Sequence, residues 1–259
     1  MIHSSRFIRV LRKRGRPLLQ FGSLTVIVIC LRLYITGSER HQNVELTFAG
    51  SKYGGWWYNA ALLDKSSVIY SFGLGEDTSW DEAILHEGFD VYGFDPTPKS
   101  AAYVLAREEL RAQPGNFHFT AEGLYNESAV LTFTMPLDPS HVSLEQGVHD
   151  NRGPLLHLKV DSLRSFMGRN GHKHIDVLKL DIESSEYDVL EGLIRTRFLP
   201  FTQLLVEFHQ RFASIGSTRH DRLLRSLQEN GFRITHQHGE SEISFQRCGS
   251  SREEIYRAG

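Results

Sequence analysis

The sequence predicts an α/β fold of the Rossmann-like kind, in which helices cover both faces of a mostly parallel sheet. Two observations support this prediction. From about residue 67 onward, segments rich in β-branched and aromatic residues alternate with segments of helical character, and strands separated by helices usually pair in parallel. Polar and acidic residues also follow the ends of several strands. Because such sheets bind ligands at the carboxyl ends of their strands, these residues form the candidate site.

The expected elements follow one another along the chain. Strands are predicted at residues 67–72, 89–94, 116–121, 128–134, 175–181 and 203–208. Helices are predicted at residues 79–86, 98–112, 162–168, 185–195 and 219–230. A loop-rich stretch is predicted at 135–154, and a hairpin at 232–236 with 243–246. The glycines and aromatic residues of 52–58 are interpreted as an N-terminal cover over the core, with a flap over a ligand as the alternative.

The bulk composition limits the class of protein. The chain has 259 residues, of which 40% are hydrophobic and 23% are charged, enough for one globular domain with an N-terminal extension. The net charge is −2, which indicates no polyanionic partner, so no nucleic acid is expected to bind.

The N-terminal residues are expected to anchor the chain in a membrane. Basic residues crowd the segment 6–16 without an acidic residue, and an apolar stretch follows that is long enough, at roughly 17 residues, to span a bilayer. The pattern predicts a basic cytosolic tail (1–17), a transmembrane signal anchor (18–35), a stem (36–50) and a lumenal domain (51–259). The chain would be a single-pass type II membrane protein of the Golgi or endoplasmic reticulum. A cleaved signal peptide and a soluble apolar helix are the alternatives.

The cysteines and one sequon bear on the same location. Cys30 falls in the predicted anchor and Cys248 near the C-terminus, so no disulfide is expected within the domain. Cys248 is left as a free thiol or an intermolecular link, and the oligomeric state stays open. Asn126 begins an Asn-Glu-Ser sequon, which predicts glycosylation in the lumen.

A glycine turn follows the first predicted strand. Gly73 and Gly75 allow the chain to turn tightly and its N–H groups to approach a ligand. A dinucleotide fingerprint would have a further glycine where Thr78 stands. The carboxylates of Glu76 and Asp77 would repel a pyrophosphate and suit a ligand that carries an ammonium group and a sulfonium.

Two more acidic residues are candidates for cofactor binding. Asp95 follows the second strand, about 20 residues after the glycines, where a carboxylate can accept hydrogen bonds from both hydroxyls of a ribose. Its alternative role is to cap the N-terminus of a helix or to form the turn before Pro96. Glu122 follows the third strand and could hold an adenine edge, although a structural role fits its position equally well.

An acidic turn and a histidine follow two further strands. Asp181 and Glu183 come after the most hydrophobic strand, where carboxylates are costly unless they meet a cation, a donor or water. Glu207 and His209 share one face at the end of the next strand. We expect these side chains to converge, with His209 taking a proton from an acceptor hydroxyl. The set could also hold a divalent metal, although the prediction assigns none. The alternatives are a surface histidine and helix capping, with Glu186 in a capping box.

Five segments together resemble the FkbM-type methyltransferases. They are Tyr70–Asp77, Gly93–Pro96, Val160–Leu163, Asp176–Glu186 and Val189–Gly192. The similarity covers about residues 53–246 and is closer still to the membrane-anchored methyltransferase-like animal proteins of that group. It implies a class I fold with a mostly parallel seven-stranded sheet, and S-adenosylmethionine held by Gly73, Gly75, Asp95 and the turn that begins at Asp181. Members with a known substrate act on hydroxyl groups of small molecules or sugars.

One departure from the family pattern bears on the acidic turn. Ser184 stands where the family commonly has glycine, and serine is strained wherever φ is positive.

The expected function is S-adenosylmethionine-dependent O-methylation of a hydroxyl on a glycan or small secreted molecule, with His209, Glu207 and Glu183 as the catalytic set. The main alternative is a catalytically inactive lumenal binding or scaffold protein. A nicotinamide-dependent oxidoreductase is a second alternative.

Overall fold

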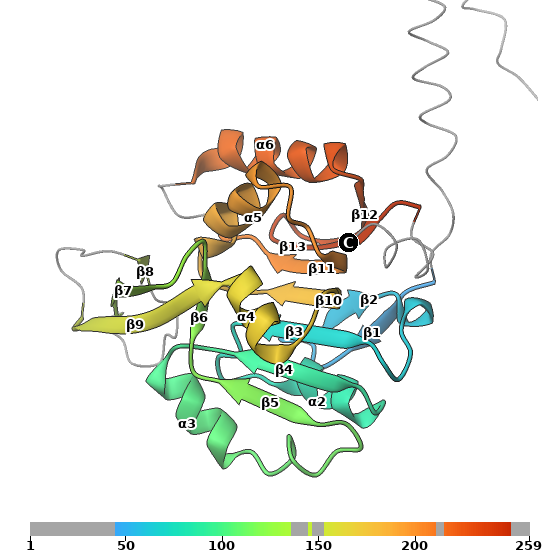
Figure 1. Cartoon of the computed structure of the whole chain (residues 1–259), viewed down its shortest axis with the longest axis vertical. Coiled ribbons are helices and arrows are strands. Elements are labelled where there is room, and N and C mark those ends of the chain that lie inside the picture. Colours follow the sequence, from blue (N-terminus) through green and yellow to red (C-terminus); the bar gives the residue numbers. More distant parts are fainter. Residues whose placement is uncertain (1–44, 136–144, 147–152, 211–214, 250–259) are drawn as a thin grey trace, which may run out of the picture. The chain divides into compact units, whose positions relative to one another are not determined.

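The computed structural model describes residues 45–135, 145–146, 153–210 and 215–249 (Figure 1). The predicted tail and anchor and most of the predicted stem lie outside these residues. Within the described part of the chain, no helix is long and apolar enough to cross a membrane. The fold given below is that of the unit that begins at Glu45.

A seven-stranded sheet with the order β12-β13-β11-β10-β3-β4-β5 forms the centre of this unit. Its strands are β3 (Val68–Phe72), β4 (Asp90–Phe94), β5 (Phe117–Thr120), β10 (Ile175–Leu180), β11 (Phe201–Glu207), β12 (Phe232–His238) and β13 (Glu242–Arg247). The strands from β11 to β5 pair in parallel, and β13 lies antiparallel between β11 and β12. The predicted α/β fold and the predicted C-terminal hairpin are therefore confirmed.

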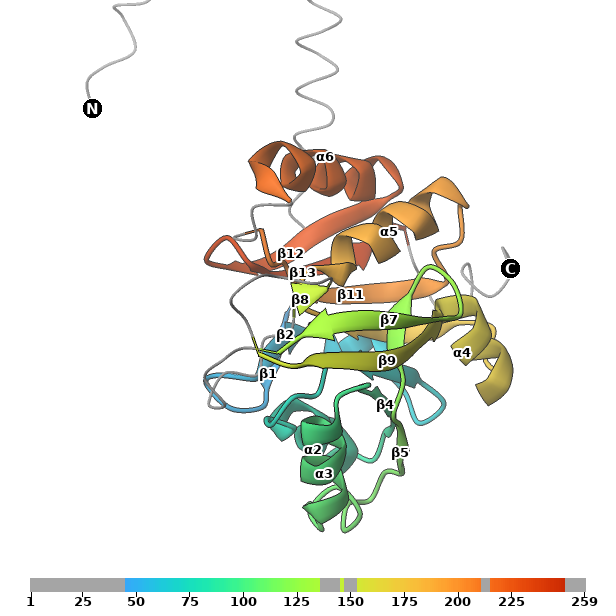
Figure 2. The ribbon, with the colours of Figure 1, turned by 90° about the vertical axis from the view of Figure 1, so that its left-hand side faces the viewer.

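Helices pack on both faces of this sheet (Figures 1 and 2). They are α2 (Ser79–His86), α3 (Pro98–Ala106), α4 (Leu163–Asn170), α5 (Ser185–Arg195) and α6 (Gly216–Glu229). On one face, α4, α5 and α6 bury the larger core cluster, which includes Phe72, Phe166 and Leu190. On the other face, α2 and α3 bury a second cluster around Trp80 and Ile69. β10 is buried at every position and β3 at every position after Val68, as expected for central strands that are covered on both faces.

The N-terminal segment covers the sheet beside α2. Its elements are β1 (Thr47–Ala49), β2 (Trp56–Tyr58) and a short 3-10 helix, η1 (Ala60–Leu62). The N–H of Asn59 donates to Gln203 Oε1 of β11 at 2.7 Å, and its side-chain amide donates to Gln246 Oε1 of β13 at 3.1 Å. Trp56 and Tyr58 are buried in the second core cluster. These contacts confirm the interpretation of this segment as a cover over the core.

A second sheet is inserted between β5 and β10, with the order β6-β9-β7-β8. Its strands are β6 (Gly123–Tyr125), β7 (Ala129–Thr134), β8 (Glu145–Gln146) and β9 (Leu155–Ser162). It lies at the edge of the main sheet towards which the parallel strands point (Figures 1 and 2). The sequence predicts β7 but not β6 or β9. β9 is formed through pairing with β7, a partner far earlier in the chain, and local sequence does not encode such pairing.

One predicted helix is too long. The sequence predicts α3 to residue 112, but the helix ends at Ala106. Arg107 takes extended dihedral angles (φ −82°, ψ 101°), and its guanidinium pairs with Glu82 of α2 at 2.6 Å. Arg107 thus leaves the helix and pairs with α2, an outcome that helical propensity does not contain.

The order of strands reverses between β3 and β10, where the two strand ends approach each other closely. Gly73 has φ +79°, and a Cβ built on it would lie 1.6 Å from the carbonyl oxygen of Asp181. The N–H of Asp181 donates to the carbonyl of Phe72 at 3.0 Å. Only glycine fits at position 73, because any side chain would displace the backbone of the neighbouring strand.

Gly73→Ala is therefore expected to destabilise the domain by at least about 2 kcal/mol, through collision and through the left-handed backbone. Gly168→Ala is the matched control, because a Cβ at that position in α4 would meet no atom within 4 Å. It should be neutral or stabilising by up to about 1 kcal/mol. Urea and thermal denaturation of the full chain measure both changes. Unaltered stability of Gly73→Ala would contradict the close approach of the two strands.

Candidate functional site

Asp95 ties the glycine turn after β3 to the end of β4. The N–H groups of Leu74 and Gly75 both donate to Asp95 Oδ2, each at 3.0 Å. Asp95 Oδ1 accepts from the N–H and the hydroxyl of Thr97, at 2.9 and 2.7 Å. The structure thus gives Asp95, which is buried, the turn-forming role that the sequence left as an alternative. The ribose contact stays a prediction.

The turn is open to a ligand at Gly75. This residue has φ +54°, and a Cβ built on it would meet no atom within 4 Å. Gly73 differs, since the backbone of Asp181 fills the space beside it. Open space at a glycine turn beside the reversal of strand order is where α/β folds of this kind bind cofactors. The turn therefore fits a bound cofactor at Gly75, while Gly73 serves the packing of the strands.

A buried lysine that the sequence analysis did not select supports the same turn. Lys179 on β10 is 4% exposed, and its Nζ donates to the carbonyl oxygen of Gly73 at 2.9 Å. Asp81 of α2 interacts with Lys179 and with Ser71 of β3. Burial raises the pKa of Asp81 to about 6, although the charge of Lys179 opposes this. The signal in the sequence is a lysine inside the most hydrophobic predicted strand.

The acidic pair beside the turn is engaged by other side chains. Glu76 pairs with Lys99 at 2.7 Å. Asp77 accepts from the hydroxyl of Ser51 at 2.8 Å and from the N–H of Ser79 at 2.9 Å. Both carboxylates thus have partners within the protein, and a contact with the ammonium group of a ligand stays a prediction.

Glu122 lies in a cavity of about 420 Å³ lined mainly by residues of β7 and β9 and by Arg169 of α4. A guanidinium nitrogen of Arg169 donates to Glu122 Oε2 at 2.6 Å and lies 3.7 Å from Asp161 Oδ2. The charge of Glu122 is therefore balanced by a cation of the protein. The structure leaves its proposed adenine contact as a prediction.

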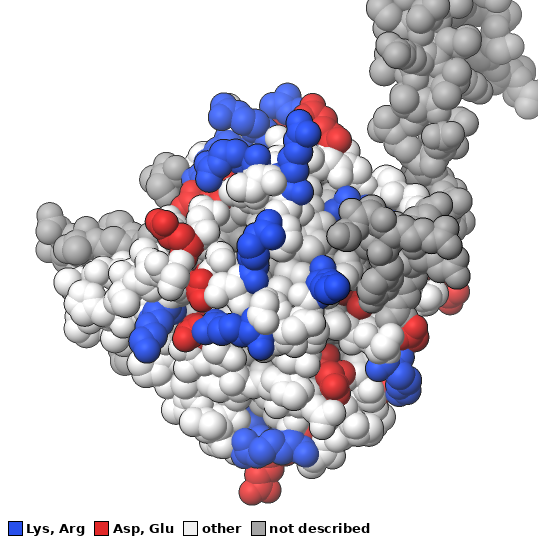
Figure 3. All heavy atoms as spheres, viewed as in Figure 1, with Lys and Arg blue, Asp and Glu red and all other residues white. Residues whose placement is uncertain are grey.

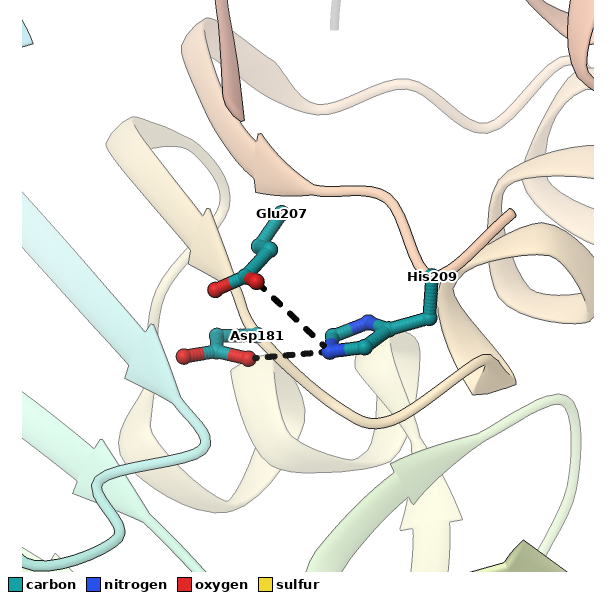
Figure 4. A group of neighbouring side chains, drawn as sticks. All are labelled: Asp181, Glu207 and His209. Atoms are coloured by element: carbon teal, nitrogen blue, oxygen red, sulfur yellow. Dashed lines mark ion pairs between the residues drawn. The ribbon is translucent and has the colours of Figure 1, made fainter. Parts of the chain in front are cut away.

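Five residues form what we call the acid–histidine cluster: Asp181, Glu183, Glu186, Glu207 and His209. The Nε2 atom of His209 lies 3.8 Å from Asp181 Oδ1, 3.4 Å from Glu183 Oε2 and 3.9 Å from Glu207 Oε1. Figure 4 shows the imidazole ring of His209 and the carboxylates of Asp181 and Glu207 facing one another at the ends of β10 and β11. The side chain of His209 is 2% exposed, and those of Asp181, Glu183 and Glu207 are 25–34% exposed. The structure thus brings together the four residues selected from the sequence.

Glu186 is the member whose role the sequence analysis missed. It lies in the first turn of α5 and is 0% exposed. Its Oε1 accepts from the backbone N–H of His209 at 2.7 Å and lies 3.2 Å from Nδ1 of the ring. These two contacts hold the imidazole so that Nε2 faces the other carboxylates. From the sequence, Glu186 is predicted only as a capping residue, because it lies 23 residues from His209 in the chain and comes close to it only in the folded domain.

The acidic turn has a left-handed backbone. Glu183 has φ 50° and Ser184 has φ 78°, and such angles cost on the order of 1–3 kcal/mol for a residue other than glycine. The position where the family commonly has glycine therefore does have a positive φ in this chain, and Ser184 occupies it. The turn places the carboxylate of Glu183 beside His209, so the strain lies within the candidate site.

The carboxylates of the cluster keep a proton on His209. Burial lowers the pKa of His209, but the hydrogen bond and charge of Glu186 and the charges of Glu183 and Asp181 outweigh it and raise the pKa to about 9. Burial and the charge of Asp181 raise the pKa of Glu207 to about 7. At neutral pH, His209 is therefore an imidazolium and can act as a base only after it loses this proton. Its role as a base stays a prediction.

A Rossmann-like sheet with an open glycine turn and a polar cluster at its reversal of strand order defines a cofactor-binding α/β domain. A family model described as "Methyltransferase FkbM domain" matches residues 73–234, more than half of the chain. The chain belongs to this family of methyltransferases, and the resemblance noted in the sequence is confirmed. Methyltransferases of this class in general use a cofactor of the S-adenosylmethionine type.

Curated relatives agree with this assignment. Probable methyltransferase-like protein 24 of Homo sapiens is 29% identical over 185 residues, which are 68% of this chain and 43% of the relative. The protein of the same name in Rattus norvegicus is 28% identical over 68% of this chain and 44% of its own length. This chain therefore matches less than half the length of these relatives. A solved rRNA methylase of Streptococcus thermophilus aligns over 73% of this chain and 90% of its own, with 11% identity and a TM-score of 0.39, too low to carry an argument.

Asp81→Asn is expected to stabilise the domain at neutral pH. The pKa of Asp81 rises from 3.8 to about 6, so the folded state binds this proton more tightly than the unfolded state does. Asp81 therefore lowers the stability of the unmodified chain as pH rises between these values, by about 3 kcal/mol in total. Urea denaturation from pH 4 to pH 8 measures both proteins, and the stability gained in the variant should grow across this interval. A variant less stable than the unmodified chain at pH 8 would refute the assignment.

Proposed function

We propose that this chain is an S-adenosylmethionine-dependent O-methyltransferase that acts on a hydroxyl of a glycan or a small secreted molecule in the lumen of the secretory pathway. The observation that most supports it is the position of two features at one reversal of strand order. The open turn at Gly75 and the acid–histidine cluster follow β3, β10 and β11, which are direct neighbours in the sheet. Methyl transfer needs such a neighbourhood, because donor and acceptor have to be held in line.

The proposed cofactor-binding residues are Gly73, Gly75 and Asp95 at the glycine turn, Asp181 at the end of β10, and Glu122 after β5. When bound, S-adenosylmethionine supplies a methyl group carried on a sulfonium. The contribution of the protein is to fix the cofactor against the turn, which Asp95 and Lys179 hold rigid from two sides.

The acceptor side of this proposal is the acid–histidine cluster. A hydroxyl is a poor nucleophile until its proton is at least partly withdrawn. The half-buried carboxylates of Glu183 and Glu207 can accept a hydrogen bond from such a hydroxyl, and His209 is held in a fixed orientation beside them. With S-adenosylmethionine bound, the hydroxyl proton would pass to a carboxylate of this cluster while the methyl group leaves the sulfonium for the acceptor oxygen, with S-adenosylhomocysteine as the leaving group. Glu183, Glu207 and His209 are accordingly the proposed catalytic residues.

Charges of both signs lie on the face of the domain that is drawn in Figure 3. Basic and acidic side chains are interspersed on the face drawn in Figure 3, with basic residues gathered over α6. Of these, Arg219 pairs with Glu191 at 2.8 Å and also with Asp188, so its charge is balanced within the protein. A nucleic-acid partner would need a broad cationic surface, and we propose none, because the net charge of the chain is −2.

The rival proposal, an inactive lumenal scaffold, has less support. A scaffold has no need of an open turn, of five buried or half-buried ionisable side chains, or of the strained backbone at Ser184. Such features cost stability and persist when function requires them. Cofactor binding without turnover of any hydroxyl acceptor would instead favour the scaffold.

Calorimetry of S-adenosylmethionine with the purified full chain tests the cofactor. We expect saturable binding that Asp95→Asn weakens at least about tenfold, a loss of about 1.4 kcal/mol, because the variant loses an acceptor of the turn and the ribose contact. Asp90→Asn is the matched control, since Asp90 makes its hydrogen bonds to Asn116 at the amino end of the same strand. It should bind as the unmodified chain does. A folded chain that binds no S-adenosylmethionine would rule out the enzyme.

Glycosylation of Asn126 tests the lumenal location. Asn126 is exposed on the turn between β6 and β7, where an oligosaccharide can be attached without entering the core. In cells, we expect the chain to shift in mobility on treatment with an N-glycosidase, and Asn126→Gln to abolish that shift. Asn170→Gln, which lies outside any sequon, should leave it unaltered. An unshifted chain that is protected from protease in sealed vesicles would show a lumenal domain without this glycan, and an unshifted, accessible chain would place the domain in the cytosol.

A further inference from the structure

The acid–histidine cluster holds more negative charge than its protein cation balances. Four carboxylates surround one imidazole, which carries at most one positive charge, and the charge of Lys179 also acts on Asp181, so the carboxylates still outnumber the cations. Glu186 Oε2 is buried and has no hydrogen-bond partner among the residues that the structure describes. Carboxylates gather in a partly buried site at a high cost unless a cation meets them. The cluster therefore has the charge of a site for a divalent cation.

The distances between its ligand atoms fit one ion. One oxygen of Asp181, one oxygen of Glu207 and a nitrogen of His209 all lie within 4.8 Å of one another. Divalent ions bind such atoms at about 2.0–2.6 Å, so two ligands of one ion are separated by at most about 4–5 Å. Figure 4 shows the two carboxylates directed at Nε2 of the ring. All three atoms can thus contact a single ion with small movements of the side chains.

An independent feature of the structure points in the same direction. Glu186, at 0% exposure, holds the other ring nitrogen, Nδ1, at 3.2 Å. A histidine that binds a metal almost always donates its second ring N–H to a carboxylate or carbonyl, which fixes the tautomer and directs the free nitrogen at the ion. The contact between Glu186 and His209 is such an arrangement, and Nε2 faces the three remaining carboxylates.

We propose that Asp181, Glu207 and His209 bind a divalent cation, which displaces the proton from Nε2 of the imidazole, with Glu183 beside them as a fourth ligand or as a contact to a bound water. Two carboxylates and one imidazole suit Mn²⁺ or a similar first-row ion, whereas Ca²⁺ prefers a shell of six to eight oxygens. The exposed side of the carboxylates leaves positions at the ion open. The next step rests on the proposed function. The open positions would hold the oxygen of the acceptor hydroxyl, so the cation would orient the acceptor towards the turn at Gly75.

Electron paramagnetic resonance of Mn²⁺ added to the purified full chain tests this site directly, because bound Mn²⁺ loses the sharp signal of the free ion. We expect saturation at one ion per chain and a nitrogen coupling from the imidazole of His209. Glu207→Gln should weaken binding at least tenfold, and His209→Gln should abolish the nitrogen coupling. Glu242→Gln is the matched control, since Glu242 lies opposite Glu207 in the β11–β13 ladder. This substitution removes a nearby charge but no proposed ligand. It should change the affinity less than threefold.

The outcomes separate this site from the proposed function. Absence of Mn²⁺ binding by the unmodified chain, or equal losses in Glu207→Gln and Glu242→Gln, would overturn the metal site. Circular dichroism establishes that each variant is folded, and a variant that fails to fold is replaced by Asp181→Asn, for which the same tenfold loss is expected. S-adenosylmethionine binding is measured on the same preparation. Cofactor binding without Mn²⁺ binding overturns the metal site alone, and Mn²⁺ binding without cofactor binding overturns the methyltransferase proposal alone.

Discussion

The close approach of the ends of β3 and β10 is the constraint on which the rest of the candidate site depends. Gly73 has no side chain, so the carbonyl oxygen of Asp181 occupies the space where a Cβ would stand. The approach brings the amino group of Lys179 within 2.9 Å of the carbonyl of Gly73. The glycine turn and the acidic turn therefore lie side by side at the reversal of strand order. Any cofactor at the first turn would be next to the carboxylates of the second.

Two kinds of support keep this arrangement rigid. Asp95 binds two N–H groups of the glycine turn and holds it against β4. Glu186, entirely buried in the first turn of α5, fixes both the backbone and the ring of His209. In each case a buried carboxylate gives up contact with water in exchange for protein donors. The active groups of the candidate site are thus positioned by residues that themselves need not touch a ligand.

The four-stranded inserted sheet is an addition to the seven-stranded main sheet of this domain. β6, β7, β8 and β9 lie at the edge where the parallel strands end (Figure 2), and the cavity at Glu122 and Arg169 is lined in part by β7 and β9. In α/β domains, the segments that follow the carboxyl ends of strands decide which ligand is recognised. Family membership establishes a methyltransferase, and we propose that this edge takes part in the choice of acceptor.

The sequence by itself determined the alternation of strands and helices, the glycine turn, and the four residues Asp181, Glu183, Glu207 and His209, because hydrophobic periodicity and strand ends are local properties. It did not determine the roles of Lys179 and Glu186, the end of α3, or the pairing of β9. Each of these depends on a partner distant in the chain: Gly73, His209, Glu82 and β7. Tertiary structure also decided that Asp95 holds the glycine turn and that the residues from Trp56 to Tyr58 cover the core. The physical reason is the same throughout, since a buried charge or an unpaired strand is stable only once its distant partner is in place.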